Sequence, residues 1–190
     1  MVMKNKLFSI FCTLIFLFYS SSILAKQENS VYQAGILIGL SSGQLDGSST
    51  LEELSKYGNF GLCTVNGAAG ELIFLDDKNY LADNTGNAKV ISPQTKTPFT
   101  TIINFKPEIS FYLHNIETMD DLAKAIDQHL PSKNFFYAIK IEGTFAEIKA
   151  RAIDPQTKPY IPLSEWLKQH QHIFYLKDEA ATIVAFRSPD

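Results

Sequence analysis

Cysteine is scarce in this chain of 190 residues, which contains only Cys12 and Cys63. Cys12 lies in an N-terminal segment that we expect to be removed, so the remaining chain cannot form an intramolecular disulfide. Internal repeats, low-complexity tracts and runs of like charge are also missing. With 45% hydrophobic and 19% charged residues, the composition is typical of a globular protein and excludes collagen-like, coiled-coil and wholly disordered chains.

The first 25 residues have the features of a secretory signal peptide. Lys4 and Lys6 precede the apolar run Leu7–Tyr19, and the small residue Ala25 follows at the expected cleavage position. A membrane anchor is the alternative, but the run is shorter than the roughly 20 residues that a spanning helix needs. We therefore expect residues 1–25 to be a signal peptide and residues 26–190 to form one domain, exported to the periplasm or secreted.

The rest of the chain carries little net charge and no second hydrophobic span. Removal of Lys4 and Lys6 from the 17 basic residues leaves an excess of acidic residues, of which there are 20. A mildly acidic protein is a poor ligand for nucleic acid or for an anionic membrane surface. We expect a small molecule as the partner, and no nucleic acid or membrane once the signal peptide is removed.

Turn residues and apolar periodicity predict an α+β fold, with a mixed or antiparallel sheet and a few covering helices. Thr50 and Glu53 have the spacing of a capping box that begins a short helix ended by Gly58. Thr118 begins a second helix that Pro131 ends, and a third surrounds Trp166.

The predicted strands are bounded by Gly, Asn, Asp and Pro. A hairpin around Glu142-Gly143 is predicted to join two of them. The strands are Phe60–Asn66, Glu71–Leu75, Ala88–Ser92, Phe99–Phe105, Phe135–Ile141 and Thr144–Ile153, with two further runs at the end of the chain.

Three residues are candidates for chemistry, each with an ordinary alternative. Glu71 opens an apolar strand, where burial would raise the pKa of its carboxyl toward the range useful for proton transfer, unless it is an exposed turn residue. Arg151 has small or apolar neighbours and could bind a substrate carboxylate with both nitrogens, unless it forms a surface ion pair. Thr64 is a plain strand residue unless a nearby group uses its hydroxyl.

His170 and His172 form the one histidine pair with a spacing that suits a metal. Alternate residues of a strand share one face, so both imidazoles could ligate the same ion. Solvent-exposed polar residues are the alternative, because a stable site needs at least three protein ligands. The chain has no cysteine pair, phosphate-binding glycine loop or Gly-x-Ser-x-Gly sequence that would indicate thiol, nucleotide or hydrolase chemistry.

Several stretches together resemble the acetolactate decarboxylase family, in matching order and spacing over about Val31 to Asp190. They are Tyr57–Asn66, Gly70–Leu72, Lys96–Phe99, Asn134–Phe145, Lys149–Arg151 and Gln156–Tyr160. The resemblance implies the family's fold and the decarboxylation of 2-acetolactate, a 2-hydroxy-3-keto acid, to acetoin and carbon dioxide in acetoin biosynthesis. It further implies a zinc ion held by three histidines, and the homodimer that the family suggests.

The same resemblance assigns expected roles to the three candidates. Glu71 matches the family's strand glutamate, a proton donor, and Arg151 matches the arginine that orients the substrate carboxylate. Thr64 matches a threonine that hydrogen-bonds in the pocket. Together they predict the substrate-orienting half of a decarboxylase site.

Some family features are missing from the sequence. The family's zinc histidines follow a segment that resembles Thr182–Asp190, and this sequence ends before them, as it does before a second acidic residue. His170 and His172 lie upstream, so the resemblance gives them no metal role. Cys63 and Asp77 stand where the family usually has glycine. The expectation is a C-terminally truncated member in which zinc is implied by the family but its ligands are absent.

Three functional hypotheses follow. The chain is a carbon–carbon lyase of the acetolactate decarboxylase type; or it is a truncated remnant that binds a keto acid through Arg151 or dimerises without metal or catalysis; or a separate C-terminal piece completes its site. Turnover of acetolactate with zinc and with chelator distinguishes catalysis from binding.

Overall fold

The computed structural model describes residues 30–67, 69–83 and 87–189. The signal peptide expected over residues 1–25 lies outside the described residues. Within these three ranges, no helix is long and apolar enough to cross a membrane.

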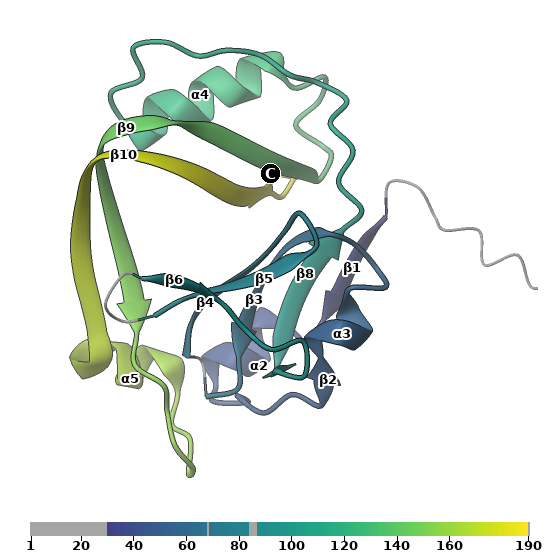
Figure 1. Ribbon diagram of the computed structural model, residues 1–190, viewed down its shortest axis with the longest axis vertical. Helices are drawn as coiled ribbons and strands as arrows, with labels where there is room; N and C mark the ends of the chain where they lie inside the picture. Colours follow the sequence, from purple (N-terminus) through teal and green to yellow (C-terminus); the bar gives the residue numbers. More distant parts are fainter. Residues whose placement is uncertain (1–29, 68, 84–86, 190) are drawn as a thin grey trace, which may run out of the picture.

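A six-stranded antiparallel sheet forms the centre of the structure, in the order β1-β8-β3-β4-β5-β6 (Figure 1). Its β4–β5 connection is a two-residue turn in which Asp76 and Asp77 both have positive φ angles, the backbone of a tight hairpin. Aspartate tolerates this conformation, so Asp77 needs no glycine there. The strands are β1 (Val31–Ala34), β3 (Phe60–Val65), β4 (Ala69–Leu75), β5 (Lys78–Ala82), β6 (Ala88–Val90) and β8 (Phe99–Ile103).

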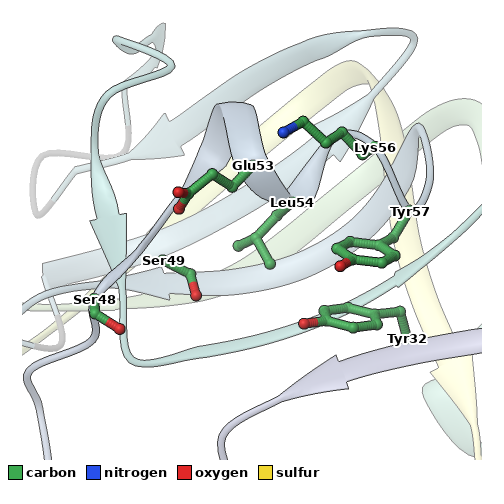
Figure 2. A pocket seen from close by; sticks show the side chains of 7 residues that line it. All are labelled: Tyr32, Ser48, Ser49, Glu53, Leu54, Lys56 and Tyr57. Carbon is green, nitrogen blue, oxygen red and sulfur yellow. The ribbon is translucent and has the colours of Figure 1, made fainter.

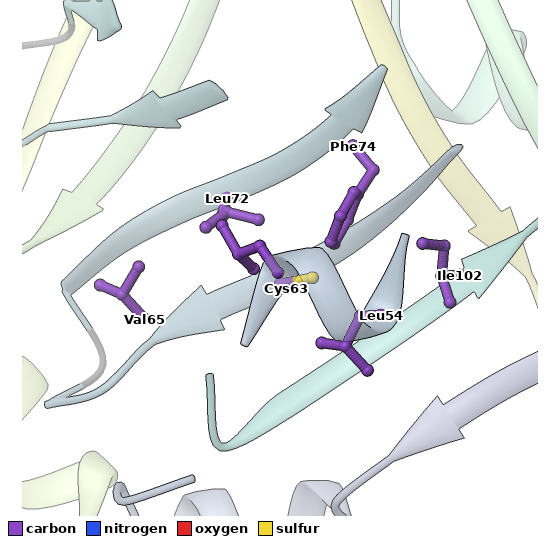
Figure 3. Close-up of a cluster of buried hydrophobic side chains, with 7 residues drawn as sticks. Leu54, Cys63, Val65, Leu72, Phe74 and Ile102 are labelled. Carbon is purple, nitrogen blue, oxygen red and sulfur yellow. The ribbon is translucent and has the colours of Figure 1, made fainter. Parts of the chain in front are cut away.

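One face of this sheet carries the main hydrophobic core under the short helix α3 (Leu51–Leu54) (Figure 3). The predicted capping box is confirmed: the Thr50 hydroxyl accepts from the Glu53 amide at 3.2 Å, and the Glu53 carboxylate accepts from the Thr50 amide at 2.9 Å. The helix thereby presents two leucines to the sheet. The buried cluster is Leu51, Leu54, Cys63, Val65, Leu72, Phe74 and Ile102.

Cys63 is part of this core rather than of a reactive site. Its thiol lies 2.6 Å from the Thr100 hydroxyl, and burial raises the pKa of the thiol to about 12. A thiol with such a pKa is uncharged at neutral pH, so Cys63 packs as a small apolar side chain.

A long two-stranded sheet of β9 (Tyr137–Ile153) and β10 (Gln171–Arg187) arches over the other face (Figure 1). Phe186 of β10 packs edge-on against Phe60 of β3, with ring centroids 6.0 Å apart. On the far side of β10, Arg187 donates to Asp127 of α4 (Met119–His129) at 2.7 Å. The two-stranded sheet of β9 and β10 is therefore held between the central sheet and α4.

The hairpin predicted around Glu142-Gly143 is wrong. Both residues lie inside β9, where Glu142 pairs with Thr182 and Gly143 with Ala181. The partner strand β10 has the same 17-residue length, so pairing continues through the local turn signal. The chain reverses later, through the loop 154–162 and the helix α5 (Leu163–His170).

The other predicted elements agree with the structure apart from some boundaries, except that the two runs predicted at the end of the chain form the single strand β10. Thr118 caps α4 by accepting from the Asp121 amide at 3.1 Å, and the helix ends before Pro131. By contrast, α3 ends at Leu54 rather than at the predicted Gly58. A Cβ at Gly58 would lie 2.2 Å from the Ile103 carbonyl oxygen, so glycine permits a close approach to β8.

Four strands are absent from the sequence prediction. Strands β1 and β5 belong to the central sheet, whereas β2 (Ser49–Thr50) and β7 (Lys96–Thr97) pair with each other as a small separate sheet. The remaining short helix is α2 (Leu37–Ser41). The α+β class, dominated by an antiparallel sheet, is confirmed.

The core makes a direct stability prediction at Leu72, which is fully buried. Leu72→Ala is expected to lower the free energy of unfolding by about 3 kcal/mol, because the removed methyl groups leave a cavity. Urea unfolding followed by circular dichroism measures this loss. Lys89→Ala on the exposed edge strand β6 is the control and should change stability by less than about 0.5 kcal/mol; equal losses for the two variants would contradict the prediction.

Candidate functional site

Thr64 and Glu71 lie side by side at an irregularity between β3 and β4. The strands pair Cys63 with Leu72 and Val65 with Ala69, so two residues of β4 stand opposite Thr64 alone. This two-against-one count is a β-bulge, a feature that redirects side chains and is frequent beside functional sites. One of the two residues opposite Thr64 is Glu71.

Both side chains belong to the sheet face opposite the main core. Cys63, Val65 and Leu72 point into the core cluster, and neighbouring residues of a strand point to opposite faces. Thr64 is 8% exposed, whereas Glu71 is open to solvent. The pair therefore combines a shielded hydroxyl with an accessible carboxyl.

Protein atoms nevertheless surround Glu71 closely enough to affect its ionisation. Desolvation raises the pKa of the Glu71 carboxyl, and the positive charge of Arg151 lowers it in part. Since desolvation is the larger influence, Glu71 retains a proton to higher pH than an ordinary glutamate. A raised pKa favours the protonated form that a proton donor needs.

Arg151 reaches this site from a distant part of the sequence. It lies on β9, opposite Ile173 of β10, and β9 contacts β4. Lys140 of the same strand forms an ion pair with Asp76 at 3.7 Å, which is a second link between β9 and the end of β4. The structure thus brings together Thr64, Glu71 and Arg151.

The two histidine candidates do not join that group. His170 is the last residue of α5 and His172 lies in β10, so they do not share a strand. His172 Nε2 lies 2.9 Å from Asp154 Oδ2, and His170 Nδ1 lies 3.7 Å from the same oxygen. His170 also stacks on Trp166, with centroids 3.5 Å apart.

These contacts show histidines that pack the junction of α5 and β10. Sequence reasoning overlooked Asp154 as their shared partner. The signal was weak, since a single aspartate beside a proline is typical of any loop. Among the described residues, no group of three or more His, Cys, Asp or Glu side chains could hold a metal ion.

A shallow pocket of about 500 Å³ lies elsewhere, beside α3 (Figure 2). Tyr32 and Tyr57 form one wall as a parallel stack with centroids 3.8 Å apart. Leu54 lies between this stack and the serines Ser48 and Ser49. Tyr32 and Leu54 both pack with the main core, so this pocket lies on the face of the sheet opposite Glu71.

The fold and the site define a class of sheet-rich α+β protein in which a bulge sets a carboxyl of raised pKa beside a threonine and near an arginine. Residues 31–190 match the family model described as alpha-acetolactate decarboxylase. The chain belongs to the alpha-acetolactate decarboxylase family.

Curated relatives carry the same description. The chain is 35% identical to alpha-acetolactate decarboxylase of Brevibacillus brevis, over 86% of this chain and 57% of the relative. It is 36% identical to that of Bacillus subtilis strain 168, over 85% of this chain and 63% of the relative. The chain therefore spans less than two thirds of the length of these curated relatives.

Solved structures agree with the fold. The crystal structure of alpha-acetolactate decarboxylase from Bacillus subtilis strain 168 superposes with a TM-score of 0.79 at 36% identity, covering 84% of this chain and 68% of that one. A Staphylococcus aureus protein of unknown function, similar to alpha-acetolactate decarboxylase, gives a TM-score of 0.80 at 35% identity, covering 85% and 68%.

The raised pKa of Glu71 predicts a pH-dependent effect of Glu71→Gln on stability. Below about pH 4.3, the pKa of a glutamate in the unfolded chain, Glu71 is protonated in both the folded and the unfolded states, and its contribution to stability is fully present. As the pH rises through the higher pKa of the folded state, the partly desolvated carboxyl becomes charged and this stability is lost. The variant is therefore expected to be more stable than the unmodified chain at pH 7 and equally stable below about pH 4.

Urea unfolding across this pH range measures the difference. Glu147→Gln on exposed β9 is the matched control and should show no such trend. A Glu71→Gln variant that is less stable at pH 7 than at pH 4, relative to the unmodified chain, would refute the assignment.

Arg151→Met tests the electrostatic contact directly. Because the Arg151 charge lowers the pKa of Glu71, its removal should raise that pKa further. Titration of ¹³C-labelled glutamate carboxyls by NMR reports the change. Lys149→Met, two residues earlier on the same strand, should leave the Glu71 titration in place; a shift of equal size in both variants would mean that Arg151 has no specific role.

Proposed function

We propose that the chain serves in the decarboxylation of 2-acetolactate to acetoin. The observation that carries this proposal is the Glu71–Arg151 pair beside Thr64, in a chain whose curated relatives are named alpha-acetolactate decarboxylases. A small keto acid with a carboxylate suits this set of side chains, because it offers an anion to Arg151 and needs a proton from Glu71.

The chemistry sets two demands. When a β-keto acid loses carbon dioxide, the electrons of the broken carbon–carbon bond form an enediolate. The carbon that carried the carboxylate must then receive a proton. Arg151 would bind the substrate carboxylate through two nitrogens and so orient the bond that breaks. Glu71 would hold the proton on its carboxyl and deliver it to the carbon.

The accessibility of Glu71 completes this sequence. After donating its proton, Glu71 is a carboxylate that the nearby Arg151 charge stabilises. Because the side chain is open to solvent, water can return the proton before the next turnover. The Thr64 hydroxyl would hydrogen-bond a substrate oxygen across the bulge.

The zinc ion that the resemblance implies does not fit the described residues. A zinc site takes three protein ligands or more, and the described part of the chain offers no group of that size. His170 and His172 face Asp154 rather than Glu71 or Arg151. The proposed steps are therefore those of Glu71, Arg151 and Thr64.

A binding or dimerisation module without catalysis is the second candidate. The same absence of a metal-ligating group from the described ranges favours it, because stabilisation of an enediolate usually calls for a strong electrophile. In that case Arg151 would still bind a small keto acid, and a homodimer would be the assembly to look for. Binding without turnover distinguishes the two candidates.

We further propose that the chain is exported to the periplasm or secreted after cleavage behind Ala25. The basic start and short apolar run of residues 1–25 support this. Mass spectrometry of the protein purified from the cell exterior or periplasm should find Lys26 as its first residue, whereas an intact N-terminus in the membrane fraction would indicate an anchor.

The first measurement is acetoin release from racemic acetolactate by the purified chain, with added zinc and with chelator. Catalysis predicts acetoin, and Glu71→Gln should lower kcat about 100-fold because the proton donor is lost. Arg151→Lys should raise KM about tenfold because the two-nitrogen contact is lost.

Lys149→Met is the control and should retain the full rate. No acetoin from a folded chain, together with Arg151-dependent binding of a keto acid in calorimetry, would reject catalysis and support the binding module. Chelator-sensitive turnover would show that residues outside the described groups supply a metal site.

A further inference from the structure

The loop 154–162, which leaves the end of β9, contains a buried amide that the proposed chemistry does not use. Gln156 is 5% exposed, and its side chain makes two hydrogen bonds to one residue. Its Oε1 accepts from the Ile161 amide at 3.0 Å, and its Nε2 donates to the Ile161 carbonyl at 3.3 Å. The side chain thus imitates a strand backbone and closes the loop on itself.

The backbone of Gln156 binds the turn that precedes the bulge. Its amide donates to the Gly67 carbonyl oxygen at 2.8 Å. Gly67 has a φ of +81°, and a Cβ there would lie 2.6 Å from the Gln156 carbonyl oxygen. Glycine is therefore required twice, for the left-handed backbone and for the close approach.

The outer part of the loop is attached to a different segment. Asp46 forms an ion pair with Lys158 and accepts from the Tyr160 hydroxyl at 2.8 Å. At the loop's start, the Asp154 carbonyl oxygen accepts from the Trp166 indole at 2.8 Å. The loop 154–162 is therefore bound to neighbouring segments at both ends and at its centre, which restricts its movement.

This connection joins the two strands of the candidate site. Gln156 follows Arg151 by five residues, and Gly67 precedes Glu71 by four. The Gln156–Gly67 hydrogen bond therefore ties the end of the strand that carries Arg151 to the beginning of the strand that carries Glu71.

We propose that Gln156 is a positioning residue. Its side chain closes the loop 154–162 on Ile161 and so holds its backbone amide against the Gly67 carbonyl oxygen, which sets the separation of Arg151 and Glu71. The proposal rests on the site described under the proposed function, and it assigns Gln156 no contact with substrate. Its consequence is a coupling between a buried amide and the carboxyl chemistry of Glu71.

Gln156→Met tests this coupling, because methionine has a similar volume and no amide. The two side-chain hydrogen bonds to Ile161 are lost, whereas the backbone amide that binds Gly67 remains. The loop is therefore expected to loosen around that contact, and Arg151 is expected to move away from Glu71. NMR titration of ¹³C-labelled glutamate carboxyls should then show a further rise in the pKa of Glu71, in the direction expected for loss of the Arg151 charge. In an active chain, kcat/KM for acetolactate should fall about tenfold, mainly through KM.

Thr157→Val is the matched control, since Thr157 is the exposed neighbour in the same loop. It should leave both readouts unchanged. Tyr160→Phe is the second variant and removes only the hydrogen bond to Asp46, so it folds even if Gln156→Met does not. It should move the Glu71 titration in the same direction by a smaller amount.

The outcomes separate this proposal from the proposed function. An unchanged or lowered Glu71 pKa in Gln156→Met, or in Tyr160→Phe where Gln156→Met does not fold, overturns the positioning role, whether or not the chain releases acetoin. A raised pKa in a chain that releases no acetoin supports the positioning role and rejects catalysis alone. The titration needs no substrate, so it reports on geometry independently of turnover.

Discussion

The pairing of β3 between β4 and β8 is the constraint on which the rest of the structure depends. One face of β3 contributes Cys63 and Val65 to the main core, and the other presents Thr64 toward the sheet of β9 and β10. A shift of one residue would exchange these faces and expose the core side chains. The bulge opposite Thr64 adds one residue to β4, so the register that buries Leu72 also brings Glu71 beside Thr64.

The properties of Glu71 come from a balance of two opposing influences. Surrounding protein raises the pKa of its carboxyl, and the charge of Arg151 moderates the rise. A complete ion pair would hold the group ionised and unable to donate, whereas full burial would cut it off from solvent protons. The observed position, accessible yet partly desolvated, suits a group that must gain and lose a proton repeatedly.

Family membership rests on the sequence match, whereas the site rests on the positions of three side chains. The family match covers residues 31–190, and Glu71 lies beside Thr64 and within the electrostatic influence of Arg151. His170 and His172 lie apart from these side chains, because Asp154 and Trp166 hold them at the junction of α5 and β10. Their short spacing in the sequence has a packing explanation, so it carries no evidence for metal binding.

The sequence by itself determined the local features of this protein and the identity of its family. Caps such as Thr50 with Glu53 and Thr118 depend on contacts within one helical turn, so residue spacing was enough to predict them. The α+β class followed in the same way from turn residues and apolar periodicity. The motif series identified Glu71, Arg151 and Thr64 as candidates before any geometry was known.

Only the tertiary structure decided how those candidates meet. The two-against-one pairing at Thr64, the approach of β9 to β4 and the link from Gln156 to Gly67 join residues far apart in the chain. Glu142-Gly143 forms no turn, because the pairing of β9 with β10 along their full length outweighs the turn preference of two residues. Such interactions depend on which surfaces are buried together, and that information is distributed over the whole fold rather than over any local pattern.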